Sequence, residues 1–312
     1  MRKTCVNMVY ELAKRDPRVL FIGSDLSPGL LKEMKAEMPD RHYMEGIAEQ
    51  AVMGMAAGFA FDGYMPFVNT IATFITRRCY EQVALDVCLH DLPVRLIGNG
   101  GGVVYAPLGP THLAVEDFAL MRALPNMAVT AVCDADEMIR LMNATLDYPH
   151  PIYIRLAKGG DKIVSRAEKG FAIGKGILMH ESSQPAEALL ITTGVMTTNA
   201  LAAASIVAKN ANIAVNILHL HTIKPLDVAM ILEQAARVPF VFTIEEHSQM
   251  GGLGSAVLEC LHEHASFPLP KVKRLALPDA FVHHYGSQGQ LWDYYGLSSA
   301  KIAHTLFSIL RG

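Results

Sequence analysis

Strand-like and helix-like segments alternate along almost the whole chain, and this alternation limits the possible folds more than any other feature. In the first half, short apolar runs rich in β-branched residues lie at residues 19–23, 66–70, 94–98, 128–133 and 152–156. Helical patterns lie at residues 48–61, 81–90 and 136–147. Continuous apolar runs of this length suit strands that are covered on both faces. We therefore expect a parallel, doubly wound α/β sheet.

A second α/β pattern follows a polar stretch that begins near residue 158. Its expected strands lie at residues 188–192, 214–219, 240–244 and 272–276, and its expected helices at residues 198–209, 226–236, 254–264 and 298–310. We predict two doubly wound domains, one at residues 1–160 and one at residues 187–312. Residues 161–186 would form a linker, with a small antiparallel strand pair within residues 170–180.

The composition argues against several classes of function. The net charge is −3 and no run is rich in Lys or Arg, whereas nucleic acid binding needs concentrated basic surface. No stretch approaches about twenty apolar residues and the first residues include charges, so we expect neither a membrane span nor a signal peptide. Five scattered cysteines without metal or redox spacing indicate a reduced, cytoplasmic setting. The apolar fraction of 51% fits a chain that buries a subunit interface.

Two short segments carry the clearest chemistry. Residues 46–50 (GIAEQ) place Glu49 at the start of a helix built from small residues, and residues 109–112 (GPTH) hold His112 in a turn that Gly and Pro make rigid. A carboxylate and an imidazole are suited to acid and base catalysis. Taken singly, each residue has an ordinary structural role: a Glu at a helix start favours the helix dipole, and a loop His forms a hydrogen bond.

The two segments resemble the pyrimidine-binding domain of the transketolase family, thiamine diphosphate enzymes that move two-carbon ketol units. The later segments at residues 221–227 (HTIKPLD) and 245–254 are similar to the C-terminal domain of that family. The resemblance implies a pyrimidine-binding domain followed by a transketolase C-terminal domain. It also implies that Glu49 binds and activates the aminopyrimidine of the cofactor and that His112 contacts substrate oxygens. We expect Pro225 in the first turn of a helix.

Aromatic residues near position 80 match family positions that pack on the pyrimidine ring. The resemblance assigns this cofactor-binding role to Phe74 and Tyr80, because stacking needs a flat apolar face. Ordinary core packing is the alternative for both. Arg77 and Arg78 depart from the commoner pattern, in which a second Phe occurs nearby. They would face an anionic substrate, a subunit carboxylate or solvent.

Three positions bear on the substrate. Arg155, at the end of a strand, matches a family arginine that grips the substrate phosphate, with a structural ion pair as the alternative. Leu108 stands where common transketolases have an Asp that contacts a sugar hydroxyl. Gly100 replaces a phosphate-binding His, within a glycine-rich loop that would pass close to cofactor or substrate. The resemblance therefore implies a changed pocket and a modified, branched, shortened or sulfonated ketose.

No Gly-Asp-Gly segment is followed by Asn some thirty residues later, the pattern that holds Mg²⁺ and diphosphate in this class. We assign no metal ligand to this chain. We expect the C-terminal catalytic subunit of a split transketolase, active only with an N-terminal partner in an α2β2 assembly, with thiamine diphosphate and Mg²⁺. It would transfer a ketol unit from an anionic ketose to an aldose. The alternatives are a subunit of a 2-oxoacid dehydrogenase or a deoxyxylulose-phosphate synthase, and a non-catalytic scaffold.

Overall fold

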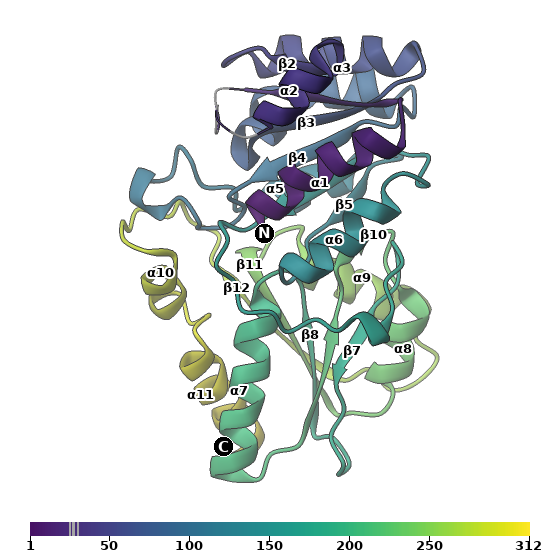
Figure 1. Cartoon of the computed structure of the whole chain (residues 1–312). Helices are drawn as coiled ribbons and strands as arrows, with labels where there is room; N and C mark the ends of the chain where they lie inside the picture. The colour runs from purple at the N-terminus through teal and green to yellow at the C-terminus, as the bar shows by residue number, and fades with distance from the viewer. Residues whose placement is uncertain (25, 27–28, 30) are drawn as a thin grey trace.

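A computed structural model of the chain describes residues 1–24, 26, 29 and 31–312. Two α/β layers lie one above the other, with the first half of the chain in the upper layer of Figure 1. The sheet of the upper layer has seven strands in the order β10-β5-β6-β4-β3-β1-β2. Their bounds are β1 Val19–Gly23, β2 His42–Met44, β3 Met65–Ile71, β4 Arg95–Asn99, β5 Ala128–Thr130, β6 Ile152–Leu156 and β10 Thr222–Lys224.

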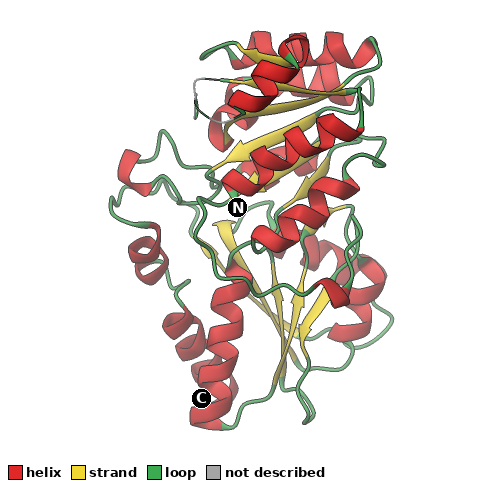
Figure 2. Ribbon diagram, in the orientation of Figure 1, coloured by secondary structure: helices red, strands yellow, loops and turns green. Residues whose placement is uncertain are grey.

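The lower sheet has five strands in the order β12-β11-β8-β9-β7. Their bounds are β7 Ile177–His180, β8 Ala188–Thr192, β9 Val215–His219, β11 Phe240–Ser248 and β12 Lys271–Leu277. Four of these five strands run parallel, and helices cover both faces of the sheet, as the ribbon in Figure 2 shows. The structure therefore confirms a doubly wound α/β fold for both halves of the chain.

Each sheet also carries one antiparallel edge strand beside its parallel strands. Strand β7 pairs antiparallel with β9, so residues 170–180 do not form a strand pair of their own. Strand β10 belongs by sequence to the second half but pairs antiparallel with β5 of the first sheet. The backbone of Ala131 extends this contact, because its N–H donates to the carbonyl of His221. The two halves thus share one sheet edge.

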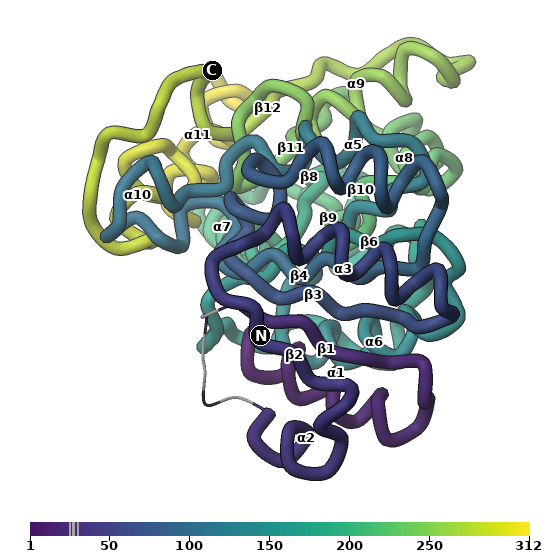
Figure 3. The backbone as a smooth tube through the Cα atoms, turned by 90° about the horizontal axis from the view of Figure 1, so that it is seen from above, coloured from purple at the N-terminus to yellow at the C-terminus, as the bar shows by residue number. Residues whose placement is uncertain are grey.

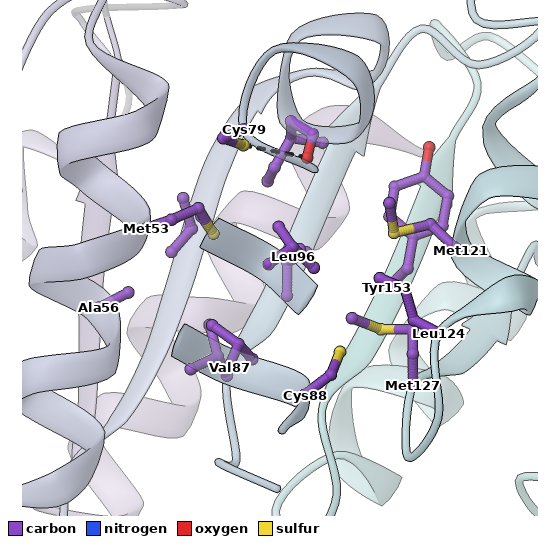
Figure 4. Close-up of a cluster of buried hydrophobic side chains, with 14 of the residues drawn as sticks. Met53, Ala56, Cys79, Val87, Cys88, Leu96, Met121, Leu124, Met127 and Tyr153 are labelled. Carbon is purple, nitrogen blue, oxygen red and sulfur yellow. Dashed lines mark hydrogen bonds between the residues drawn. The ribbon is translucent and has the colours of Figure 1, made fainter. Parts of the chain in front are cut away.

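Helices lie on both faces of the upper sheet, seen from above in Figure 3. One face is covered by α1 Arg2–Arg15, α2 Lys32–Glu37 and α6 Ala135–Ala144. The other is covered by α3 Glu49–Phe61, α4 Tyr80–Gln82 and α5 Asp117–Ala123. In the close-up of that second core, Met53 and Ala56 project from α3 toward Leu96 of β4 (Figure 4). Small residues on α3 let it lie close to the sheet.

The lower sheet is covered in the same way. Helices α7 Met196–Ala211, α10 Gln288–Tyr294 and α11 Ser299–Arg311 pack on one face. Helices α8 Val228–Ala235 and α9 Leu253–His264 pack on the other. Helix α8 begins after Pro225, and the Asp227 side chain caps it by accepting a hydrogen bond from the N–H of Met230. The expectation that Pro225 lies in the first helical turn is therefore wrong.

Candidate functional site

The candidate site lies at the carboxyl edge of the upper sheet, where α/β proteins place their ligands. Glu49 begins the helix that follows β2, Phe74 follows β3, and His112 lies in the long loop after β4. These three strands are close neighbours in the order β2-β1-β3-β4. Parallel strands bring their carboxyl ends to one edge, so the topology gathers residues that are far apart in the sequence.

Glu49 presents a buried carboxylate at the N-terminus of α3. Its side chain is 3% exposed, a rare state for Glu unless a partner compensates the charge. The hydroxyl of Thr70 lies 3.4 Å from Oε1, and Nη1 of Arg78 donates to Oε2 at 2.8 Å. The carboxylate is thus held between a strand-end hydroxyl and one arginine.

Phe74 and Arg78 lie in a wide helical turn. Residues Phe74–Arg78 form a π-helical turn, a rare form that is frequent at functional sites. The guanidinium carbon of Arg78 lies 4.1 Å from the centre of the Phe74 ring. Arg78 therefore stacks on Phe74 and pairs with Glu49 at the same time, a contact that the sequence prediction missed. The spacing of Phe74 and Arg78, four apart in a helix, could have indicated that they meet.

His112 lies next to the same aromatic ring. Its ring centre is 5.4 Å from that of Phe74, in an edge-on arrangement. Nδ1 of His112 lies 2.9 Å from the hydroxyl of Thr111, which leaves Nε2 to meet a ligand. The structure thus gathers Glu49, Phe74 and His112, which the sequence singled out, in one region. Arg78 lies between Glu49 and Phe74 and contacts both.

Two adjoining clefts open beside these residues. One has a volume of about 580 Å³ and is lined by Thr73, Phe74, Arg77, Arg78, Pro110, Thr111 and Phe281. The other, of about 410 Å³, is lined by Arg77, Pro110, Leu113, Val115, Glu116, Ser248, Pro278, Asp279, Ala280, Phe281 and Val282. Phe281 is 77% exposed and comes from the loop before α10 in the second half of the chain, which the sequence analysis did not connect with the site.

Arg77 separates the two clefts. Its Nε lies 3.1 Å from Oε1 of Glu116, and its guanidinium reaches the carbonyl of Thr111 at 3.4 Å. Burial raises the pKa of Glu116, and the charge of Arg77 opposes that rise. Arg77 and Arg78 therefore each have a carboxylate of this chain as a partner, and they point to different parts of the site.

Tyr80 packs into the core instead of lining either cleft. Its ring lies against the buried cluster between α3 and α5, and its hydroxyl donates to the carbonyl of Leu120 at 3.1 Å. This arrangement favours the alternative of ordinary core packing. Tyr80 can support the turn that carries Phe74, but within the described residues the cleft wall is built from other side chains.

Arg155 lies in a buried network, which favours the structural ion pair that the sequence left open. Its Nε lies 3.1 Å from Oδ2 of Asp117, and both side chains are almost fully buried. Its Nη2 donates to the carbonyls of Ala114 and Glu246 at 2.9 and 2.7 Å. The hydroxyl of Tyr153 donates to the same Asp117 at 2.7 Å. These contacts engage Nε and Nη2 of Arg155 inside the chain, which favours a structural role for this side chain.

Gly100 and Leu108 lie in the loop after β4 but in different surroundings. Gly100 is buried with a φ of +72°, and a Cβ at this position would stand 2.1 Å from the Tyr105 ring. Its conformation and the close approach of Tyr105 explain the glycine without a substrate. Leu108 is 52% exposed, and in the part of the chain that the structure describes it lies outside the lining of both clefts.

The glycine-rich segment at residues 251–254 has a structural role. The N–H groups of Leu253 and Gly254 at the start of α9 donate to the carboxylate of Glu245 at 2.7 and 2.8 Å. A Cβ on Gly252 would stand 2.1 Å from that carboxylate. Burial raises the pKa of Glu245 to about 7. The glycines thus make room for an internal carboxylate.

Among the described residues, one buried group has the donor types of a metal site: Cys133, Glu137 and His219. Nε2 of His219 lies 2.9 Å from Oε2 of Glu137. Burial would raise the pKa of Glu137, but the charge and hydrogen bond of His219 outweigh it and lower that pKa to about 2. The N–H of Cys133 donates to the same carboxylate at 2.7 Å. The pair ties the two halves together, and we assign no metal to it.

Both halves of the chain match transketolase family models. Residues 1–160 match the model described as transketolase, pyrimidine binding domain, and residues 179–302 match transketolase, C-terminal domain. No helix among the described residues is long and apolar enough to cross a membrane.

Three similar proteins share nearly the full length of this chain. The 6-deoxy-6-sulfo-D-fructose transketolase subunit SqwH of Clostridium sp. (strain MSTE9) is 32% identical over 99% of this chain and 94% of its own length. An apulose-4-phosphate transketolase subunit of Phocaeicola vulgatus is 31% identical over 99% and 97%. A solved structure of a split gene transketolase, an inactive beta4 tetramer, is 32% identical with a TM-score of 0.89 and covers 99% of this chain and 97% of that one.

Proposed function

The chain belongs to the transketolase family as a subunit of a split transketolase, a transferase, and from this premise we propose how its residues contribute to ketol transfer. The proposal assigns Glu49, Phe74 and His112 to the reaction. The observation that carries it is the buried Glu49 carboxylate at the carboxyl edge of the sheet, connected to Phe74 through Arg78, with His112 beside the Phe74 ring. A non-catalytic scaffold has no use for a buried carboxylate at this edge of the sheet.

The residues at this edge fit a planar, nitrogen-bearing ring, which supports thiamine diphosphate as the cofactor. The guanidinium of Arg78 is planar and delocalised, lies on the Phe74 face and donates to Glu49. A pyrimidine with an amino group makes the same two kinds of contact. When bound, thiamine diphosphate supplies the nucleophilic carbon and electron sink for breaking a carbon–carbon bond beside a carbonyl.

Each proposed residue has a separate task. Glu49 holds and returns a proton at Oε2 against the ring nitrogen of the cofactor. Burial at 3% exposure keeps competing water from this carboxylate. Phe74 orients the ring by stacking, and His112 directs Nε2 toward the oxygens of the sugar. The clefts lined by Arg77 and Phe281 provide room for the rest of the substrate.

A partner subunit completes the site in this proposal. The relatives that match from end to end are named as subunits, and the solved relative is a split gene product. We infer that an N-terminal chain supplies the ligands for Mg²⁺ and diphosphate, and that two copies of each chain form an α2β2 heterotetramer. Five free cysteines, all buried, agree with a cytoplasmic location.

We propose an anionic ketose as donor. Two relatives are named for sugars that carry a sulfonate or a phosphate, and the exposed Arg77 offers a cation at the cleft. An aldose would accept the two-carbon unit. The apolar Leu108 supports a donor other than the standard pentose phosphates, since common transketolases resemble this chain here but carry an Asp that contacts a sugar hydroxyl.

The test is reconstitution. The isolated chain with thiamine diphosphate and Mg²⁺ should show no ketol transfer, and adding the N-terminal subunit should restore it. Strong activity of the chain alone would contradict the split-subunit proposal. Release of carbon dioxide from a 2-oxoacid would favour the alternative of a 2-oxoacid dehydrogenase or deoxyxylulose-phosphate synthase. A complex that forms but is inert toward both substrate classes would favour a scaffold.

A further inference from the structure

Arg78 occupies the place that the proposed function gives to the cofactor ring. Its guanidinium carbon lies 4.1 Å from the Phe74 ring centre, and its Nη1 donates to Glu49 at 2.8 Å. A cofactor ring stacked on Phe74 and hydrogen-bonded to Glu49 would use the same aromatic ring and the same carboxylate. The cofactor ring and Arg78 would therefore compete for these two residues.

The contact has a clear physical cause. A carboxylate that is 3% exposed is costly without a compensating charge, and Arg78 provides that charge from a neighbouring turn. A planar guanidinium also gains by stacking on an aromatic face. Until another donor reaches Glu49, Arg78 is the group that stabilises it.

The contact can open. The Arg78 side chain is 40% exposed and borders the cleft of about 580 Å³, so it has both water and space to receive it. When Arg78 leaves, its guanidinium returns to water, and the incoming cofactor takes over the hydrogen bond that the buried Glu49 carboxylate loses. Arg78 is the last residue of the π-helical turn, at the border of the cleft.

We propose that Arg78 is an autoinhibitory latch, which closes the cofactor site of this chain by taking the ring position between Phe74 and Glu49 and leaves when the cofactor binds. The proposal rests on the proposed function, because it assumes that the ring binds at Glu49 and Phe74. Only the fraction of molecules with the latch open can accept the cofactor, so the latch weakens apparent affinity in proportion to its closed population. It would keep an unassembled subunit from binding the cofactor.

The experiment measures affinity, not turnover. Thiamine diphosphate with Mg²⁺ is titrated by calorimetry into the complex of this chain and its N-terminal subunit, as wild type, Arg78→Met and Arg18→Met. Methionine keeps an unbranched apolar stem and removes the guanidinium. Arg18 is the control, because it is also exposed and ion-paired, but to Asp16 and, within the described residues, outside the lining of both clefts. We expect Arg78→Met to lower Kd about tenfold, and Arg18→Met to leave it within about twofold.

An unchanged or higher Kd in Arg78→Met would overturn the latch, and a higher value would indicate that Arg78 binds the cofactor. Arg78→Lys, which keeps a charge but lacks the planar fork, should give an intermediate Kd and provides a second test if the Met variant folds poorly. Ketol transfer by the wild-type complex is assayed in parallel. If the wild-type complex transfers ketol units but Arg78→Met does not bind the cofactor more tightly, the latch is refuted and the proposed function stands. If the wild-type complex is inert, the proposed function is refuted.

Discussion

Replacing Arg155 with Met distinguishes a structural ion pair from a substrate-binding arginine. The side chains of Arg155 and Asp117 are 8% and 0% exposed, and they lie 3.1 Å apart. Removing one partner of a buried pair leaves the other charge without compensation and costs about 3–5 kcal/mol. Two backbone carbonyls, of Ala114 and Glu246, lose their donor as well.

The expected loss can be measured as a melting temperature. At about 2.1 cal/mol/K per residue, 312 residues unfold with an entropy of about 0.7 kcal/mol/K. A loss of about 3–5 kcal/mol therefore lowers Tm by about 5–8 °C. Differential scanning calorimetry of the isolated chain gives this value. Arg18→Met is the control, because Arg18 is 54% exposed and its pair with Asp16 is worth about 1 kcal/mol or less.

A double variant isolates the pair itself. In Arg155→Met with Asp117→Asn no uncompensated charge remains, so part of the lost stability should return. The refuting result is an unchanged Tm in Arg155→Met together with a raised KM for the anionic donor in the reconstituted complex. That outcome would restore Arg155 to the substrate site, where the family resemblance puts it.

Three further predictions concern the site and the interior. Glu49→Gln should lower kcat of the complex by about 10²–10⁴-fold, while Glu45→Gln, an exposed neighbour, should leave it unchanged; a loss below tenfold would remove Glu49 from the mechanism. Leu108→Asp should raise kcat/KM for xylulose 5-phosphate relative to the native donor. If the wild-type complex already uses xylulose 5-phosphate as well as common transketolases do, the prediction of a changed pocket at Leu108 is wrong. Burial lowers the pKa of His221 and of His247 to about 4. Between pH 6.5 and 4, the unfolded chain therefore binds protons at these histidines that the folded chain does not, and the free energy of unfolding falls as the pH falls through this range. Glu245, with its raised pKa, opposes part of this loss. His221→Phe should reduce the difference in Tm between pH 7 and pH 5, and an unchanged difference would exclude His221 as a source of acid sensitivity.

The sequence predicted the regular part of the fold closely. Strands β1, β6 and β8 have the expected bounds, because continuous apolar runs between helices leave little choice of structure. The short strand β2 and helix α10 were missed, since three to seven residues give too weak a periodicity. The position of β10 could not be predicted, because pairing with β5 depends on how the two halves meet in space.

The candidate site was predicted in part. Motifs identified Glu49, His112 and Phe74, and the topology brings them to one edge of the sheet. The interaction of Arg78 with Glu49 depends on a π-helical turn, for which the sequence carries no simple signal. For Arg155, the sequence left two roles open, because an arginine at a strand end can bind either a ligand or a carboxylate of the same chain. Only the packing of the folded chain shows that Asp117 lies beside it.

The shared sheet edge has a consequence for fragments of this protein. A piece that ends at residue 160 would lack β10 and leave the outer N–H and C=O groups of β5 without their strand. It would also lose the partners of Glu137 and Arg155 that come from His219 and Glu246. Unpaired edges invite pairing between molecules, so such a fragment would tend to aggregate. We infer that folding of the first half depends on synthesis of the second at least as far as residue 224.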